Sequence, residues 1–336
     1  MFQAIYSSSS WKYLPTDLKP DFNNLLTTMI KSRSTSTAAT YLKEINRFLQ
    51  WCKDKRVNIS LPFPSAITAV YLLEVKNSKS ASSTTKAHAA LKWLHSFFPR
   101  EGLNPLDDGV CRNIVESAKR GRITPKTKKK PISAATIKQI IDRYAGDNST
   151  LKDVRTAAMC AIGFAGFRRY SELSNIKPTH ISFCKDYIVI FIPNSKTDVY
   201  REGNKVYIAK TRTKHCPVAL LERYLEMANI NRKSELYLFR RLTKTKSGYV
   251  LRKERLSYTR CREIFIECLA SLGYDPKDYG LHSLRSGGIT TAIHTDSSIS
   301  ERLLKLHGRW KTDTAKDMYV LESKQNRLRI TKSLGL

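Results

Sequence analysis

Apolar side chains recur every three or four positions in the first third of the chain, which is the spacing of one buried helix face. One such face is carried by Leu42, Ile45, Phe48, Leu49 and Cys52. Similar faces begin near Ser65, in the Ser/Thr-rich run 82–85 and near Val110. The pattern predicts a small all-α unit over residues 23–122, and the Ser-rich residues 1–22 before it are expected to form a flexible arm.

A second unit is predicted from residue 133 onward, because the periodicity changes there. Two short β-rich runs, Tyr187–Ile192 and Lys205–Ala209, flank a polar stretch and predict an antiparallel hairpin. Helical spacing surrounds this hairpin, over residues 133–144, 154–164, 258–272, 284–294, 298–307 and 312–321 and near Pro217. We therefore expect a mainly α protein with a small antiparallel sheet, in which an α+β domain spans 133–325 and a tail spans 326–336.

The net charge of the chain indicates what kind of partner it binds. The chain carries 59 Lys and Arg against 29 Asp and Glu, a formal net charge of +30. A charge of this size predicts attraction to a polyanion, and double-stranded DNA or another nucleic acid is the leading candidate. A merely soluble basic protein, or one that binds an anionic membrane, remains the alternative.

Cysteine usage and hydropathy exclude several classes of protein. The seven cysteines are scattered and form no CxxC pair, which favours reduced thiols and argues against a disulfide framework or a zinc site. Neither a signal peptide nor an apolar run of transmembrane length is visible. We expect a soluble, intracellular protein with no metal and no membrane partner.

A basic segment joins the two predicted units. It reads as an interdomain linker over residues 123–132, and the run has no acidic residue to balance it. A solvated tether and a tether that lies on the DNA backbone are both compatible with this composition. The candidate DNA-binding residues are Lys119, Arg120, Arg122, Lys126, Lys128, Lys129 and Lys130.

The second unit contains the parts that cleavage of a phosphodiester requires. These are a nucleophile, cations for the non-bridging oxygens and an acid for the departing 5′ oxygen. Arginine suits the second role because its planar fork binds two phosphate oxygens and stays charged. Such residues gather in Gly166-Phe-Arg-Arg-Tyr-Ser-Glu-Leu173, in His282-Ser-Leu-Arg285 and in the segment from Gly308-Arg-Trp310 to Tyr319.

Together these segments resemble the catalytic signature of the tyrosine recombinases, the family of lambda integrase, Cre recombinase and the Xer proteins. Arg169 is followed three residues later by Glu172, as in the first family element. His282 and Arg285 match the His-x-x-Arg element, and Trp310 stands nine residues before Tyr319. The resemblance covers about residues 34–325. Each motif alone is weak, but the ordered set is specific.

Two further features extend the resemblance. The family places a lysine on the turn of a β-hairpin between the first two elements, and Lys196 occupies that place. The stretch 196–203, with Cys216-Pro217 after it, is similar to eukaryotic mobile-element recombinases of the Crypton and DIRS-like groups.

The resemblance implies a role for each catalytic residue. Tyr319 would attack the phosphate and form a 3′-phosphotyrosyl bond, while Arg169 and Arg285 clamp the phosphate. Lys196 would protonate the 5′ leaving group, and His282 would assist proton transfer at Tyr319. Trp310 would pack near the tyrosine and offer its indole N–H to a phosphate oxygen. Glu172 would orient Arg169 or the neighbouring backbone without contacting the phosphate, and no cofactor, metal or ATP is implied.

The resemblance also implies an architecture and a reaction. The N-terminal unit is similar to the SAM-like core-binding domain, which with the catalytic domain would form a C-shaped clamp around duplex DNA. A homotetramer on two DNA sites would then carry out site-specific recombination, the integration or excision of a mobile element. Type IB topoisomerase-like relaxation and a domesticated, non-catalytic DNA-binding protein are the alternatives. The tail would dock on a neighbouring protomer or fold onto its own domain.

Three residues near the motifs have competing interpretations. Arg168 is expected at the surface or in contact with backbone, with Arg169 facing the phosphate. Arg309 is either a further phosphate contact or a solvated side chain. His307 competes for the histidine position but lies twelve residues before Tyr319. The chain has Gly-Arg-Trp where bacterial members commonly have Leu-Gly-His.

The compartment depends on the host. In a eukaryote the basic run 126–131 would serve as a nuclear import signal, and in a bacterium the protein would be cytoplasmic. The target site and the need for accessory factors are not visible in the sequence.

Overall fold

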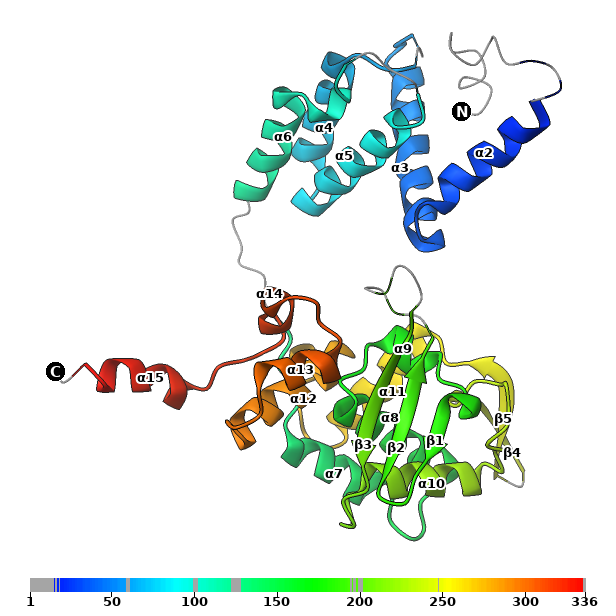
Figure 1. Ribbon diagram of the computed structural model, residues 1–336, viewed down its shortest axis with the longest axis vertical. Coiled ribbons are helices and arrows are strands. Elements are labelled where there is room, and N and C mark those ends of the chain that lie inside the picture. Colours follow the sequence, from blue (N-terminus) through cyan, green and yellow to red (C-terminus); the bar gives the residue numbers. More distant parts are fainter. Residues whose placement is uncertain are drawn as a thin grey trace. The chain divides into compact units, whose positions relative to one another are not determined.

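The chain divides into two compact units, Met1–Lys126 and Thr127–Leu336. A computed structural model describes Pro15, Asp17 and residues 19–58, 61–98, 102–121, 128–193, 195, 198, 202–246 and 248–334, with the backbone alone at 19–23 and 26. The chain is mainly helical with small antiparallel sheets, which confirms the predicted fold class (Figure 1).

The first unit is built from helices. They are α2 (Lys19–Lys31), α3 (Thr35–Asp54), α4 (Ser65–Ser78), α5 (Ala81–His95) and α6 (Gly109–Arg120), with a 3₁₀ turn at Pro105–Asp107. Helix α3 begins where the side chain of Ser34 accepts the N–H of Thr37, a typical N-cap. Its predicted apolar face is inside, with Ile45, Phe48 and Cys52 fully buried against α4 and α5.

The second unit surrounds one central helix. Its helices before the sheet are α7 (Ala134–Tyr144), α8 (Leu151–Ala165) and α9 (Tyr170–Ser174). Helix α8 is buried along nearly its whole length and packs against α7, α9, α10, α11 and α12. A helix that is apolar on all sides belongs in the middle of a core. Thr150 and Asp153 cap its start reciprocally, which satisfies the first backbone donors.

Two small sheets lie beside the helices of this unit. Strands β1 (Ile181–Phe183), β2 (Tyr187–Ile192) and β3 (Asn204–Ala209) form an antiparallel sheet in sequence order, with Ile190 opposite Val206. Strands β4 (Arg240–Thr245) and β5 (Gly248–Arg255) form a separate hairpin that the periodicity did not predict. Alternate residues of β2 (Ile188, Ile190 and Ile192) are buried, as expected for a sheet with one face on the core.

The remaining helices carry the C-terminal motifs. They are α10 (Pro217–Met227), α11 (Tyr258–Ala270), α12 (His282–Thr295), α13 (Glu301–Gly308), α14 (Asp313–Asp317) and α15 (Lys324–Lys332). Helix α14 ends two residues before Tyr319, so that tyrosine follows a helix rather than lying inside one, as the pattern over 312–321 had suggested. Helix α15 has no buried residue and extends away from the rest of its unit (Figure 1).

Candidate active site

Glu172 lies buried beneath Arg169 at the start of α9. Arg169 Nη1 donates to Glu172 Oε1 over 2.8 Å, and the Arg169 backbone N–H donates to Oε2 over 3.2 Å. The Glu172 side chain is 1% exposed, whereas that of Arg169 is 12% exposed. The carboxylate therefore fixes the guanidinium from the protein side and leaves its outer edge accessible.

A second arginine shares the same carboxylate. Arg309, from the turn after α13, donates to Glu172 Oε2 over 2.6 Å. Burial alone would raise the pKa of Glu172, but the positive charges of Arg309, Arg285 and Arg169 outweigh it and lower that pKa below its usual value. Glu172 is thus a carboxylate anion at neutral pH, surrounded by guanidiniums.

Helix α12 supplies His282 and Arg285 from its first turn. Arg285 is fully buried and donates to two backbone carbonyls, that of Phe167 over 2.5 Å and that of Gly308 over 2.6 Å. Gly288 lets α12 approach the loop after α8, since a Cβ there would collide with the Phe164 carbonyl and the Phe167 ring. Burial lowers the pKa of Arg285 to about 9, which leaves it charged at neutral pH.

Trp310 and Tyr319 complete the group on the other side of Arg285. The Arg285 guanidinium carbon lies 4.1 Å from the Trp310 ring centre and 4.9 Å from that of Tyr319. The two aromatic rings are 5.4 Å apart, and the exposed His282 has its ring 6.5 Å from Tyr319. Cations stack favourably on such aromatic faces. The structure therefore brings together Arg169, Glu172, His282, Arg285, Trp310 and Tyr319.

The backbone around Tyr319 is held from two sides. Thr290 on α12 donates its hydroxyl to the Tyr319 carbonyl over 3.4 Å and accepts the Leu321 N–H over 3.1 Å. Lys316 on α14 is buried and bonds Glu301 at the start of α13. These contacts fix the peptide that carries the tyrosine, while its half-buried side chain keeps an open edge.

Several buried donors in this group have no partner among the described residues. They are Nε of Arg285, Nε of Arg309, Nε1 of Trp310 and all three guanidinium nitrogens of Arg168. Four guanidiniums stand against one carboxylate, because Arg168 and Arg285 also lie within electrostatic range of Glu172. Unsatisfied buried donors are costly, so they mark a place where an anion or water belongs.

The structure corrects the surface position expected for Arg168 and removes one of the two alternatives for Arg309. Arg168 is 1% exposed, so it is not a surface residue, and burial lowers its pKa to about 9. Arg309 is 7% exposed and paired with Glu172, which excludes the solvated alternative. Arginine is usually found outside. The partner of Arg309 comes from a distant segment, and Arg168 has no hydrogen-bond partner among the described residues, so neither burial could be read from the sequence.

Three of the predicted site residues lie outside the described residues: Lys196, and Arg122 and Lys126 of the basic segment. Strands β2 and β3, which bracket Lys196 in sequence, pair as the hairpin prediction requires. Lys119 and Arg120 close α6 and each lie 3.4 Å from Glu116. Lys130 binds Asp278 over 2.6 Å, Lys129 donates to the Lys277 carbonyl and Lys128 is exposed. Four of the candidate DNA-binding residues therefore contact a carboxylate or a backbone carbonyl that lies outside the basic segment.

His307 has a different environment from the one an active-site base would need. Its Nε2 bonds the Ala165 carbonyl over 2.8 Å, and its ring stands edge-on to Phe167 at 4.6 Å. Burial lowers the pKa of His307, and the cations Arg309, Arg168 and Arg285 lower it further.

We expect this buried histidine to make the fold sensitive to mild acid. The unfolded chain takes up its proton near pH 6.5 and the folded one only at lower pH, so stability is present above that value and lost as the pH falls below it. Thermal unfolding measured from pH 7.5 to 5.5 should show a falling midpoint in the wild type and a smaller fall in His307→Gln. Equal slopes in the two proteins would contradict this assignment.

Within the part of the chain that is described, no helix combines the length and the apolar character needed to cross a bilayer.

Known proteins resemble the chain in sequence and in fold. No protein-family model matches it. It is 28% identical over 268 residues to an integrase/recombinase XerD homolog of Selenomonas ruminantium, a match that covers 79% of this chain and 76% of that protein.

Solved structures share the fold. XerH recombinase bound to palindromic difH DNA in a post-cleavage complex superposes with a TM-score of 0.61 at 15% identity, covering 88% of this chain and 79% of XerH. The Tn1549 transposon integrase bound to circular-intermediate DNA gives 0.55 at 14% identity, covering 92% and 98%. The chain thus resembles an integrase/recombinase in sequence over most of both proteins, and it shares its fold with these two DNA-bound enzymes.

Proposed function

We propose that the protein is a site-specific DNA recombinase that cuts and rejoins strands through a covalent bond to Tyr319. The Tyr319 oxygen attacks the scissile phosphorus, the bond from phosphorus to the 5′ oxygen breaks, and a 3′-phosphotyrosyl ester forms. The 5′ oxygen takes a proton from Lys196, and His282 accepts the tyrosine proton. Attack by another 5′-hydroxyl reverses the step, so the ester conserves the energy of the broken bond.

One observation carries this proposal. Arg285 stacks against both Trp310 and Tyr319, at 4.1 and 4.9 Å from their ring centres, while buried donors around it lack partners. A phosphate at that point would meet the outer edge of Arg169, Nε of Arg285 and the Trp310 indole N–H. Preorganised donors of this kind stabilise the charge that develops on phosphoryl oxygens.

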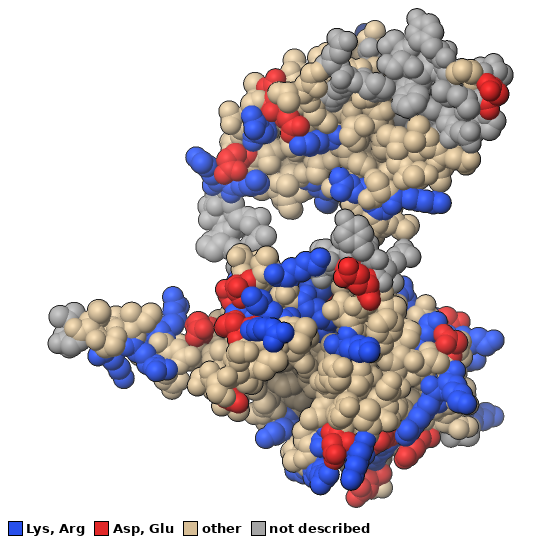
Figure 2. Space-filling view, in the orientation of Figure 1, with Lys and Arg blue, Asp and Glu red and all other residues tan. Residues whose placement is uncertain are grey.

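The charge of the molecule supports DNA as the substrate. Figure 2 shows Lys and Arg side chains distributed over the visible faces of both units, and over the whole chain they outnumber Asp and Glu by 59 to 29. We propose that the run from Lys119 to Lys130 adds sequence-independent contacts to the DNA backbone. Such contacts make affinity fall steeply with salt.

The direct test is to trap protein–DNA adducts that survive SDS. Supercoiled DNA carrying the gene's own flanks is incubated with the protein in EDTA, and adducts are mapped by primer extension. Adducts at one or two defined positions support recombination. Dispersed adducts with plasmid relaxation would favour a type IB topoisomerase, and tight binding without any adduct would favour a non-catalytic DNA-binding protein.

We also propose a finer origin, a eukaryotic mobile element of the Crypton or DIRS-like kind. The support is the stretch 196–203 with Cys216-Pro217 after it. In that case the protein would act in the nucleus, and the basic run 126–131 would direct its import.

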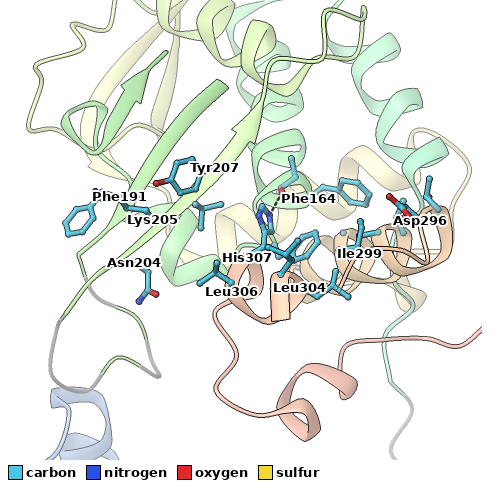
Figure 3. A pocket seen from close by; sticks show the side chains of 18 of the residues that line it. Phe164, Phe191, Asn204, Lys205, Tyr207, Asp296, Ile299, Leu304, Leu306 and His307 are labelled. Carbon is cyan, nitrogen blue, oxygen red and sulfur yellow. Dashed lines mark hydrogen bonds between the residues drawn. The ribbon is translucent and has the colours of Figure 1, made fainter. Parts of the chain in front are cut away.

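A tail that docks on a neighbouring copy would build the tetramer that this reaction requires. Helix α15 exposes Leu328 and Ile330 at 42% and 69%, although apolar side chains normally seek cover. A largely apolar cavity of about 980 Å³ lies between β3 and helices α12 and α13 (Figure 3). Its lining includes the acidic Glu202 and Asp296 together with the basic Lys205, and the two acidic side chains complement the basic side chains of α15. We propose that α15 of a second copy occupies this cavity.

Ile330→Asp tests this docking. The substitution puts a charge on the apolar face of α15, so we expect assembly on a DNA with two sites to fail while binding of one half-site persists. Sedimentation of the protein–DNA complexes measures the stoichiometry. Gln325→Asp, on the same helix, is the matched control and should assemble normally. Normal assembly of Ile330→Asp would rule out the docking face.

A further inference from the structure

Arg309 occupies a backbone position that disfavours any side chain. Its φ is +59° and its ψ is +42°, the left-handed conformation in which α13 ends. Helices commonly end on glycine in this conformation, because a Cβ there is strained. Strain of this kind persists only where the surrounding structure holds the backbone in place. A large charged residue at this point needs a compensating role.

The Arg309 side chain has such a role in its hydrogen bonds. The side chain alone is 2% exposed, and its guanidinium binds Glu172 Oε2 at 2.6 Å. The same guanidinium donates to the carbonyls of His307 at 2.8 Å, Phe167 at 3.2 Å and Gly166 at 3.3 Å. Arg309 therefore joins the turn after α13, which carries Trp310, to the loop before α9, which carries Arg169.

Arg309 shares one hydrogen-bond partner with each of the two proposed phosphate ligands, Arg169 and Arg285. Glu172 binds Arg169 through its other oxygen, at 2.8 Å. The Phe167 carbonyl accepts from Arg285 at 2.5 Å as well as from Arg309. One guanidinium thus fixes, by a single intermediate group in each case, the position of both clamp arginines.

We propose that Arg309 is a positioning residue for the phosphate site, acting through Glu172 on Arg169 and through the Phe167 carbonyl on Arg285. It is not itself a phosphate ligand in this proposal, because its charge is paired with the Glu172 carboxylate at 2.6 Å, whereas the fork of Arg285 bonds only backbone carbonyls among the described residues. The proposal deepens the recombinase function and rests on it. Its consequence is that loss of Arg309 slows the chemical step more than it weakens DNA binding.

Arg309→Gly is the decisive substitution, because glycine accepts the left-handed backbone and removes only the side chain. We measure the single-turnover rate of adduct formation at saturating DNA, and separately the dissociation constant for DNA. The rate should fall by about 10²-fold, the loss expected from ångström-scale misplacement of a catalytic group, while the dissociation constant changes by less than about threefold. Arg309→Lys, which keeps a charge near Glu172, should be faster than Arg309→Gly.

Arg212→Gly is a matched control for backbone and charge. Arg212 also has a left-handed φ of +56° and also pairs with a carboxylate, that of Asp186 at 2.7 Å, but it is exposed. Its replacement should leave the rate of adduct formation unchanged. The double variant Arg309→Gly/Glu172→Gln should be no slower than the slower single variant, because residues that act through one another are non-additive.

The possible outcomes separate the inference from the function. A wild-type rate in Arg309→Gly, a loss confined to DNA affinity, or additive losses in the double variant would overturn the positioning role. If the wild type itself forms no adduct, the recombinase function fails, and the inference is then judged on the stabilisation of the folded protein by inorganic phosphate. That thermal shift should be smaller in Arg309→Gly than in the wild type and Arg212→Gly, and equal shifts would refute the inference.

Discussion

Replacement of Tyr319 by phenylalanine is expected to abolish the covalent adduct and to leave DNA binding intact. The substitution removes one hydroxyl and keeps the ring, so the contacts with Trp310 at 5.4 Å and with Arg285 at 4.9 Å persist. Loss of the nucleophile should reduce adduct formation by more than about 10³-fold. Electrophoresis in SDS of labelled DNA after incubation measures the adduct, and filter binding measures the affinity.

The control for Tyr319→Phe is Tyr207→Phe. Tyr207 lies on β3 and is 56% exposed, so its variant loses the same hydroxyl at a surface position. It should form adducts at the wild-type rate. Adducts in Tyr319→Phe at the wild-type level would assign the nucleophile to another residue.

The second large effect is expected at Arg285. In Arg285→Lys the charge remains, but an ammonium cannot bond both the Phe167 and the Gly308 carbonyls in the geometry of the guanidinium fork. We expect adduct formation to fall by about 10²–10³-fold, as when one preorganised donor is removed from a charge-stabilising site. The variant should also unfold at lower temperature, because a buried carbonyl left without its donor costs about 1–3 kcal/mol.

Arg155→Lys separates these two effects. Arg155 is 3% exposed and donates to the Arg240 carbonyl over 2.8 Å, within the same unit but in a different cluster. It should lose stability as Arg285→Lys does, yet form adducts normally per folded molecule. Similar losses of adduct in both lysine variants would mean that the Arg285 effect is only structural.

The helices and the first sheet could be predicted because their periodicity is strong and local. The run Tyr187–Ile192 is β2 residue for residue, and the apolar face from Leu42 to Cys52 lies on α3. The hairpin of β4 and β5 was not predicted. Its sequence is dominated by exposed basic side chains, and only Leu251 packs against the core. Strands with so little burial have no alternating apolar pattern to detect.

The sequence predicted which residues form the candidate site, but not how deeply the arginines around them are buried. Spacing indicated Arg169, Glu172, His282, Arg285, Trp310 and Tyr319, and the structure gathers all six. The burial of Arg309 was not predictable, because it depends on Glu172 and on the Gly166 and Phe167 carbonyls, which are more than a hundred residues away along the chain. Arg168 is buried without a hydrogen-bond partner among the described residues, so its burial follows from tertiary packing alone. Long-range partners of this kind leave no periodic trace in a sequence.

The turn at residues 308–310 also bears on how such a site can change over evolution. The Trp310 ring lies flat on Gly308, where even a Cβ would collide with it, and Arg309 bears the left-handed backbone. Where bacterial relatives have Leu-Gly-His, the glycine stands at the left-handed position and the bulky residue stands in place of Gly308. Gly308→Leu alone would push a side chain into the Trp310 ring. Arg309→Gly alone would leave Glu172 without one of its arginine partners. The three positions should therefore covary as a block among homologues, with mixed combinations rare.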